Sequence, residues 1–311
     1  MKMPRQLLVL IAFILVVLGL SSCGSKSPAG AGRPAGIAQE ALKGQAVIFD
    51  QYAQGDALTI RVTGVPPEPQ GFVLQGWLLG PSGALNLGLL TPKEGRLDFH
   101  WNSPQGKNLV HEYTKVEATW EPGSGSNSPT GRVVFLGKIS LLGQQLFQQT
   151  GKAPQAPALG LQSQVDLSVE HAGMAKAAAQ LEDWSEMKAH LEHVINILEG
   201  RHGALFGDYL GTGVPQNPGD GWGAKTYAKE VKNLLLSAGQ NSVNAVYHEF
   251  QTETNTVENT CLAMLKHFQV TKVPTLLAEL TKTVKQLKAG SAHQLYQLAQ
   301  KSLTIPLESP Q

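Results

Sequence analysis

Cysteine is scarce in this sequence, because Cys23 and Cys261 are the only two among 311 residues. Small secreted proteins that lack a sizeable core compensate with several disulfides, and two cysteines exclude a framework of that kind. The fold must therefore be stabilised by hydrophobic cores. A chain of this length is long enough to form two of them.

An excess of either charge is also missing. The sequence has 25 Lys and Arg residues against 24 Asp and Glu residues, which gives a formal net charge of +1. A nucleic-acid-binding surface requires a cluster or stripe of basic residues, and no such stripe is present. We therefore expect no nucleic acid among the partners.

The motifs of several enzyme classes are absent. The sequence contains no G-x-S-x-G nucleophile elbow, no Walker phosphate-binding loop, no H-E-x-x-H zinc motif and no C-x-x-C-H haem motif. His100 and His111 lack a nearby nucleophile or carboxylate pair at a recognised spacing. The sequence thus predicts a protein that is not an enzyme.

Long hydrophobic segments are limited to one run near the start of the sequence, at residues 7–20. It is too short for a membrane-spanning helix of about 20 residues, but after Lys2 and Arg5 it has the length of a signal-peptide core. The run ends in "LSSCG", which resembles the lipobox of bacterial lipoproteins. The resemblance implies a signal peptide at 1–22 and lipidation of Cys23, which would anchor an extracytoplasmic protein to the cell membrane.

A tether and a β-rich region follow this N-terminal segment. Residues 23–44 are rich in Gly, Ala, Ser and Pro and predict a lipidated flexible tether. From residue 45 to 146 apolar residues alternate with polar ones, as in "ALTIRVT" and "RLDFHW", between Gly- and Pro-rich turns. This pattern is typical of short antiparallel strands and predicts an antiparallel β-sandwich domain.

Two segments of this region carry a family resemblance. "GWLLGPSGALNLGLL" followed by "VEATWEPGSGSNSPTGRVVFLG" resembles the extracytoplasmic C-terminal domain of anti-sigma-K factors of the RskA type, over residues 45–140. Ser124 departs from the family pattern, which usually has a second glycine there. The resemblance implies a sensor or binding module. Glu121 and Thr130 are expected to hydrogen-bond across the base of the glycine-rich loop.

The expected partners differ from those of a complete anti-sigma factor. Such a factor also needs a cytoplasmic sigma-binding domain and a membrane helix, and this sequence shows neither. If Cys23 is lipidated, every later residue lies outside the cytoplasm, so we do not expect direct binding to a sigma factor. The membrane is the first expected partner, through the lipid anchor, and an envelope protein or a small ligand is the second.

The spacing of apolar residues changes after a Pro/Ala-rich linker at 147–160. Within 161–305 apolar residues recur about every 3.6 positions, which predicts an antiparallel bundle of four to six helices. The fold class is therefore predicted as α+β in two domains, an antiparallel β-sandwich followed by an antiparallel α-helical bundle.

The first two helices of the bundle can be placed from their ends. The first is expected at 161–181, with Met174 on its inner face. Asp183 and Glu186 form a capping box for the second helix, which ends at Gly200.

Three histidines fall on facing sides of these two helices. His171 lies on the inner face of the first, His190 lies within the apolar arc of the second, and His193 lies at the edge of that arc. The short connection makes the helices antiparallel, so the three imidazoles should converge as ligands for a transition metal such as zinc. Glu170 and Asp166 are candidates for orienting a ring N–H. The alternative is that these are core-edge histidines hydrogen-bonded to their neighbours.

Two functions are compatible with these features. The first is a non-catalytic, surface-tethered bacterial lipoprotein that joins an anti-sigma-factor-like sensor or binding domain to a helical ligand- or metal-binding domain. The alternative is a metalloprotein with redox or hydrolytic activity at the histidine cluster. The helical half resembles helical regions of uncharacterised extracytoplasmic bacterial proteins, through "HLEHVINILEG" and "NPGDGWG", and that resemblance implies no activity.

Overall fold

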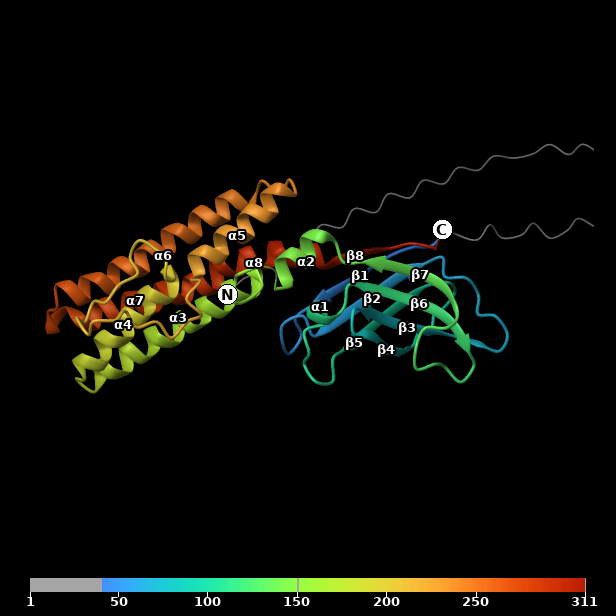
Figure 1. Ribbon diagram of the computed structural model, residues 1–311, viewed down its shortest axis with the longest axis horizontal. Coiled ribbons are helices and arrows are strands. Elements are labelled where there is room, and N and C mark those ends of the chain that lie inside the picture. The colour runs from blue at the N-terminus through green and yellow to red at the C-terminus, as the bar shows by residue number, and fades with distance from the viewer. Residues whose placement is uncertain (1–40, 150, 311) are drawn as a thin grey trace, which may run out of the picture. The chain divides into compact units, whose positions relative to one another are not determined.

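Strands and helices occupy separate stretches of the chain (Figure 1). The computed structural model describes residues 41–149 and 151–310. Seven strands and the short helix α1 (Leu109–Glu112) come first, then the remaining helices, then the short strand β8 (Thr304–Leu307). The predicted α+β class is confirmed.

The predicted signal peptide and its lipidation site, Cys23, lie outside the described residues. The predicted tether reaches residue 44, whereas strand β1 already begins at Lys43. Across the part of the chain that the structure describes, no helix is both long enough and apolar enough to cross a membrane.

The first sheet is antiparallel and has the strand order β5-β2-β1-β8. Its first three strands in the chain are β1 (Lys43–Phe49), β2 (Ala57–Thr63) and β5 (Leu97–Asn102). In β2, Leu58 and Ile60 are buried while Arg61 is exposed. The alternation in the sequence therefore separates a core face from a solvent face.

Strand β8 was not predicted from the sequence. The predicted helical bundle extends to residue 305 and therefore overlaps the first two residues of this strand. It pairs with β1 through Gly44–Leu307 and Ala46–Ile305. Ile305 is fully buried. The strand is only four residues long and contains a proline, which is tolerated here because β8 is at the edge of its sheet.

The second sheet is also antiparallel, with the order β4-β3-β6-β7. Its strands are β3 (Phe72–Gly80), β4 (Gly83–Leu89), β6 (Lys115–Pro122) and β7 (Arg132–Lys138). Trp77 on β3 is fully buried, and its indole N–H donates to Thr119 Oγ1 at 2.8 Å. Two antiparallel four-stranded sheets are thus present where the sequence predicted an antiparallel sandwich.

The glycine-rich loop between β6 and β7 is held by Glu121. This carboxylate is fully buried and accepts hydrogen bonds from the Thr119 hydroxyl, the Thr130 N–H and hydroxyl, and the Gly131 N–H, at 2.6–3.0 Å. Burial alone would raise the pKa of Glu121, but these donors lower it below its usual value. The predicted contact between Glu121 and Thr130 is confirmed, and it explains the "EPGSGSNSPTG" pattern as a loop closed on one carboxylate.

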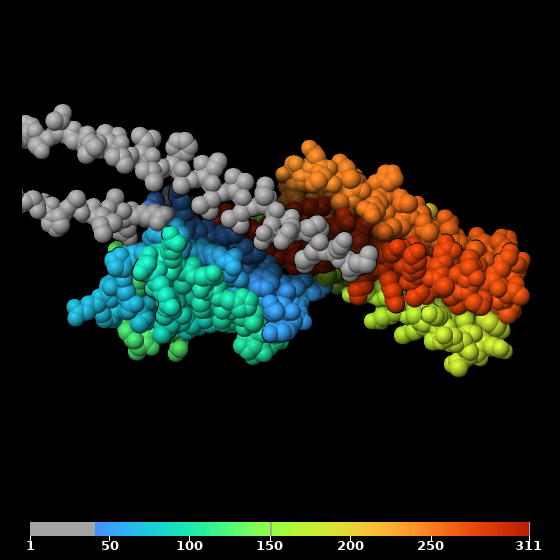
Figure 2. Space-filling model, turned by 180° about the vertical axis from the view of Figure 1, so that it is seen from behind, coloured from blue at the N-terminus to red at the C-terminus, as the bar shows by residue number. Residues whose placement is uncertain are grey.

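The helices after β7 form the second part of the fold. Short helix α2 (Leu141–Phe147) precedes them, and among the described residues the longer ones are α3 (Pro157–Gln180), α4 (Trp184–Glu199), α5 (Ala224–Ser237), α6 (Val243–Lys266), α7 (Val273–Leu287) and α8 (His293–Gln300). Helix α3 packs against α4, α5 and α7, and α6 packs against α4 and α7. On the face shown in Figure 2, orange-red α7 is at the surface beside the yellow-green ends of α3 and α4.

Two details of the helical prediction are corrected by the structure. Helix α3 begins at Pro157, inside the predicted linker, because proline is well suited to the first turn of a helix. Met174 is 46% exposed, whereas His171, Ala172 and Ala175 are buried. The buried face of α3 therefore consists largely of small residues, and this is why apolar periodicity alone misplaced it.

Candidate metal centre

The helical hairpin formed by α3 and α4 positions the three predicted histidines. His171 is on α3, and His190 and His193 are on α4. Asp183 caps α4 by accepting a hydrogen bond from the Glu186 N–H at 3.0 Å, as predicted. Only residues 181–183 connect the helices, so the two run antiparallel and side by side.

The imidazole rings converge through their Nδ1 atoms. Nδ1 of His171 lies 2.9 Å from Nδ1 of His190 and 3.3 Å from Nδ1 of His193. Possible ligand atoms of the three side chains all lie within 4.8 Å of one another, and no other such group occurs among residues 41–149 and 151–310. His171 is 8% exposed and the His190 side chain 13% exposed, so these two rings are largely shielded from water, whereas His193 is half-buried.

The outer ring nitrogens of the two α4 histidines contact acceptors. Nε2 of His190 lies 3.1 Å from Oε1 of Glu186, one turn earlier on α4. Nε2 of His193 lies 3.2 Å from Oε1 of Gln216, in the loop after α4. A carboxylate and an amide oxygen accept only, so both Nε2 atoms carry the proton when the rings are neutral. The inward Nδ1 atoms of His190 and His193 then present lone pairs.

The residues expected to orient the rings were predicted incorrectly. Asp166 forms an ion pair with Lys288 at 2.8 Å, and Glu170 is exposed. The spacing of Glu186, four residues before His190, is a sequence signal for this contact, although the capping box also accounts for Glu186. Gln216 has no sequence signal, because it is 23 residues from His193 and reaches it only through the folded loop.

The local electrostatics favour the neutral form of His171 and His190. Burial lowers the pKa of His171 to about 4, and the neighbouring His193 and His190 lower it further. Burial also lowers the pKa of His190, against the opposing effect of Glu186. Neutral imidazoles are the form that binds a metal ion.

The loop between α4 and α5 is fastened by two buried polar residues of α4. The Glu192 carboxylate accepts from the backbone N–H groups of Tyr209, Leu210 and Gln216 at 2.8–3.1 Å. Asn196 donates to the carbonyl oxygens of Gly207 and Gln216 and accepts from the Gly207 N–H, each at 2.9 Å. In the "HLEHVINILEG" segment, the histidines therefore face α3, while Glu192 and Asn196 hold the loop that carries Gln216.

Other titratable groups of the helical part do not join the cluster. His248 and His267 are exposed on and after α6. The Asp208 carboxylate accepts hydrogen bonds from the N–H groups of Thr212 and Gly213 in its own loop. Asp220 accepts from the Trp222 N–H, two residues before α5 begins at Ala224.

The β part of the chain is recognisable by comparison with known families. Residues 7–133 match the family model "Anti-sigma-K factor rskA, C-terminal". The predicted resemblance to the RskA-type domain is confirmed. The match spans less than half of the 311 residues, from the N-terminal apolar run to the start of β7, and leaves helices α2 to α8 and the histidine cluster outside the RskA-like region. No curated protein and no solved structure matches this chain.

Proposed function

We propose that this protein is a non-catalytic bacterial lipoprotein, tethered outside the cell membrane through Cys23. In this proposal the RskA-like domain acts as a sensor or binding module, and the helical part binds a transition metal ion at His171, His190 and His193. The name of the matched family refers to sigma-factor regulation. A lipidated Cys23 would keep the chain on the outer side of the membrane, so the expected partner is an envelope component and not a sigma factor.

The observation that carries the metal proposal is the convergence of three Nδ1 atoms. A tetrahedral zinc ion with Zn–N distances of about 2.0–2.1 Å holds two ligand nitrogens roughly 3.3 Å apart. The His171–His193 separation of 3.3 Å equals this value, and the His171–His190 separation of 2.9 Å needs only a small adjustment. Both separations are therefore close to those around a zinc-sized ion, and ligand atoms of all three side chains lie within 4.8 Å of one another.

The arrangement outside the rings supports the same proposal. Metal-bound histidines usually donate their other ring N–H to a carboxylate or carbonyl oxygen, which fixes the tautomer and the ring orientation. Glu186 provides such an acceptor for the outer ring nitrogen of His190, and Gln216 provides one for that of His193. Two core-edge histidines would need only ordinary hydrogen-bond partners and would not require a third ring facing them.

The test is a measurement of bound metal and of its effect on stability. The full chain, purified in detergent without chelators, should contain about one zinc, copper, nickel or iron ion by elemental analysis. After chelation, added zinc should raise the melting temperature, because a ligand that binds only the folded state stabilises it by mass action.

A matched pair of variants separates specific from nonspecific binding. His190→Ala should abolish the zinc-dependent rise, and His248→Ala, which removes an exposed histidine from α6, should leave it unchanged. If the chain is purified without metal and its melting temperature does not respond to zinc, copper or iron, the histidines have only a structural role and the metal proposal is wrong.

Hydrolytic or redox activity at the cluster is the second candidate function. The cluster supplies three protein ligands, which in catalytic zinc sites leave the fourth position for water or substrate. Zinc supplies Lewis-acid chemistry in such sites and lowers the pKa of bound water to about 7. Ester hydrolysis by the zinc-loaded chain that disappears in His190→Ala would favour this function, and its absence would leave the non-catalytic proposal.

A further inference from the structure

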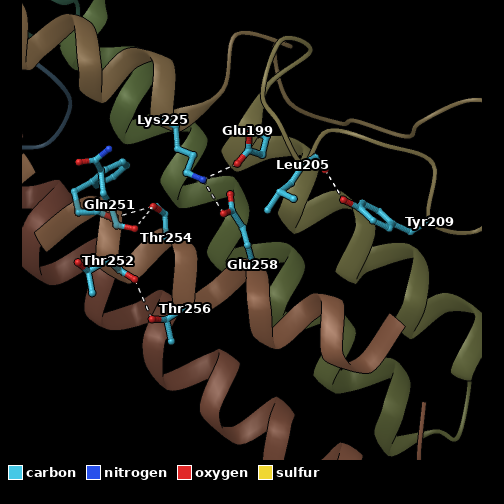
Figure 3. Close-up of polar contacts among 10 residues, drawn as sticks. Glu199, Leu205, Tyr209, Lys225, Gln251, Thr252, Thr254, Thr256 and Glu258 are labelled. Atoms are coloured by element: carbon cyan, nitrogen blue, oxygen red, sulfur yellow. Dashed lines mark hydrogen bonds and ion pairs between the residues drawn. The ribbon is translucent and has the colours of Figure 1, made fainter. Parts of the chain in front are cut away.

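A second polar cluster lies between α4, α5 and α6, apart from the histidines (Figure 3). Nζ of Lys225 lies 2.6 Å from Oε1 of Glu199, the last residue of α4, and 2.7 Å from Oε2 of Glu258 on α6. Glu258 is fully buried and Glu199 is 5% exposed. Three helices thus bring two buried carboxyl groups against the ammonium group of Lys225, whose side chain is 26% exposed.

The charges of this cluster do not balance if both carboxyl groups are ionised. Lys225 carries one positive charge, and two carboxylates would leave a buried net charge of −1. An uncompensated charge in the interior is strongly unfavourable. A neutral form is therefore strongly favoured.

The hydrogen bonding of Glu258 shows which group carries the unbalanced charge. Oε1 of Glu258 is buried and has no hydrogen-bond donor, whereas Oε2 of the same group receives the Lys225 ammonium. A carboxylate oxygen in this position would keep its full desolvation cost. A protonated Glu258 would instead have an acceptor in the adjacent Glu199 carboxylate, with which its carboxyl group is in hydrogen-bond contact.

The surroundings decide which carboxyl group holds the proton. Burial alone would raise the pKa of Glu199, but Lys225, Glu258 and the Leu205 N–H lower it below its usual value. Burial raises the pKa of Glu258 to about 8, and the negative charge of Glu199 adds to this, while Lys225 opposes it. Glu199 is therefore the carboxylate and Glu258 the acid.

We propose that Glu258 is protonated at neutral pH and donates a hydrogen bond to the Glu199 carboxylate, so that Glu199, Lys225 and Glu258 form a group without net charge beneath the 200–223 loop. We call this group of three residues the carboxyl lock.

Two residues of the carboxyl lock flank the 200–223 loop, one at each end. Glu199 directly precedes Gly200, and Lys225 follows Gly223 by two residues. The two glycines approach so closely that a Cβ on Gly223 would lie 2.4 Å from the Gly200 backbone N. The Arg201 N–H also donates to the Gly221 carbonyl oxygen at 2.9 Å. Loss of the Glu258 proton would place a second negative charge beside the point where the two ends of the loop meet. The ends of the loop would then separate.

The titratable groups next to Glu258 keep their own protons at neutral pH. Tyr209, in the loop, has its pKa raised by burial and by the nearby carboxylates, and its hydroxyl donates to the Leu205 carbonyl oxygen at 2.5 Å. Cys261, the next group on α6, is fully buried, which keeps the thiol protonated. Burial raises the pKa of Tyr247, and the positive charge of Lys225 opposes this effect.

The experiment is an infrared titration of the full chain in detergent. The wild-type protein should show the carbonyl band of a buried protonated carboxyl group at pH 7, and the band should disappear as the pH passes about 8. Glu258→Gln should lack the band. Glu249→Gln, which removes an exposed carboxyl group from the same helix, should retain it.

Hydrogen exchange of the loop amides gives an independent readout. Above pH 8 the protonated fraction of Glu258 falls about tenfold per pH unit. Protection of the 200–223 amides, corrected for intrinsic exchange, should therefore fall in the wild type and stay constant in Glu258→Gln, whose amide imitates the neutral acid. An infrared band that is absent from the wild type at pH 7 would overturn the proposal, whether or not the variant folds, and so would equal pH dependence of loop protection in the two proteins.

Discussion

The Nδ1 atoms of His171 and His190 lie 2.9 Å apart in the α3–α4 hairpin. Two nitrogen lone pairs would repel at this distance, so a proton or a cation must lie between them. In the metal-free protein, the Nδ1–H of His171 can donate to the lone pair that Glu186 fixes on His190. Binding of a metal ion would replace this proton.

Gln216 should strengthen metal binding without being a ligand. It orients the ring of His193 from the loop, so Gln216→Ala should weaken zinc affinity by about 10- to 100-fold, the usual effect of removing such a partner. Calorimetric titration of the chelated protein with zinc measures this change. Gln251→Ala, an exposed position on α6, is the matched control. Equal affinities in the two variants would show that Gln216 has no part in the site.

The stability of the metal-free protein should depend on His171 at acidic pH. The pKa of His171 is about 4 in the folded chain against 6.5 for the free side chain, so the folded state binds fewer protons between these values. The free energy of unfolding should therefore fall as the pH is lowered through this window, by on the order of 2–3 kcal/mol from this residue. Urea unfolding at pH 7 and pH 4 should show a smaller loss for His171→Asn than for the wild type. Equal losses would contradict the prediction.

Glu121 should be necessary for the glycine-rich loop of the RskA-like region. Glu121→Ala removes the acceptor for Thr119, Thr130 and Gly131, and should lower the free energy of unfolding by about 3 kcal/mol. Denaturant unfolding measures the change, with the exposed Glu68→Ala as the control. If both variants are as stable as the wild type, the Glu121 contacts do not stabilise the fold.

Lipidation of Cys23 remains a prediction from the sequence. Cys23→Ala should abolish incorporation of a fatty-acid probe during growth and should release or misprocess the protein, because the thiol is the expected attachment point. Cys261→Ala is the matched control, since that thiol is buried in α6. Equal labelling of wild type and Cys23→Ala would refute the lipid anchor.

The sequence predicted those features that depend on short-range patterns. The apolar positions Met187, Leu191, Val194 and Leu198 of α4 recur with helical spacing, and all four are fully buried. The convergence of the histidines was also predictable, because two helices joined by a three-residue turn must face each other. Where small residues formed the buried face, as Ala172 and Ala175 do in α3, the pattern was too weak and Met174 was misplaced.

The remaining features depend on long-range contacts that leave no periodic signal. Gln216 reaches the histidines only because Glu192 and Asn196 fold its loop back onto α4. The carboxyl lock joins residues from three helices, and each of them alone resembles an ordinary surface charge in the sequence. No local pattern reports that Glu258 is fully buried.

The pairing of β8 with β1 has a consequence for how the chain folds as it is made. Residues 44–47 of β1 are among the first described residues to be synthesised, yet their partners at 304–307 follow all the helices. This edge of the first sheet stays open until the helical part has been made, and an open strand edge can pair with the wrong strand. Helices α2 to α8 are therefore inserted in the chain between β7 and β8, and the first sheet is completed only when synthesis reaches β8.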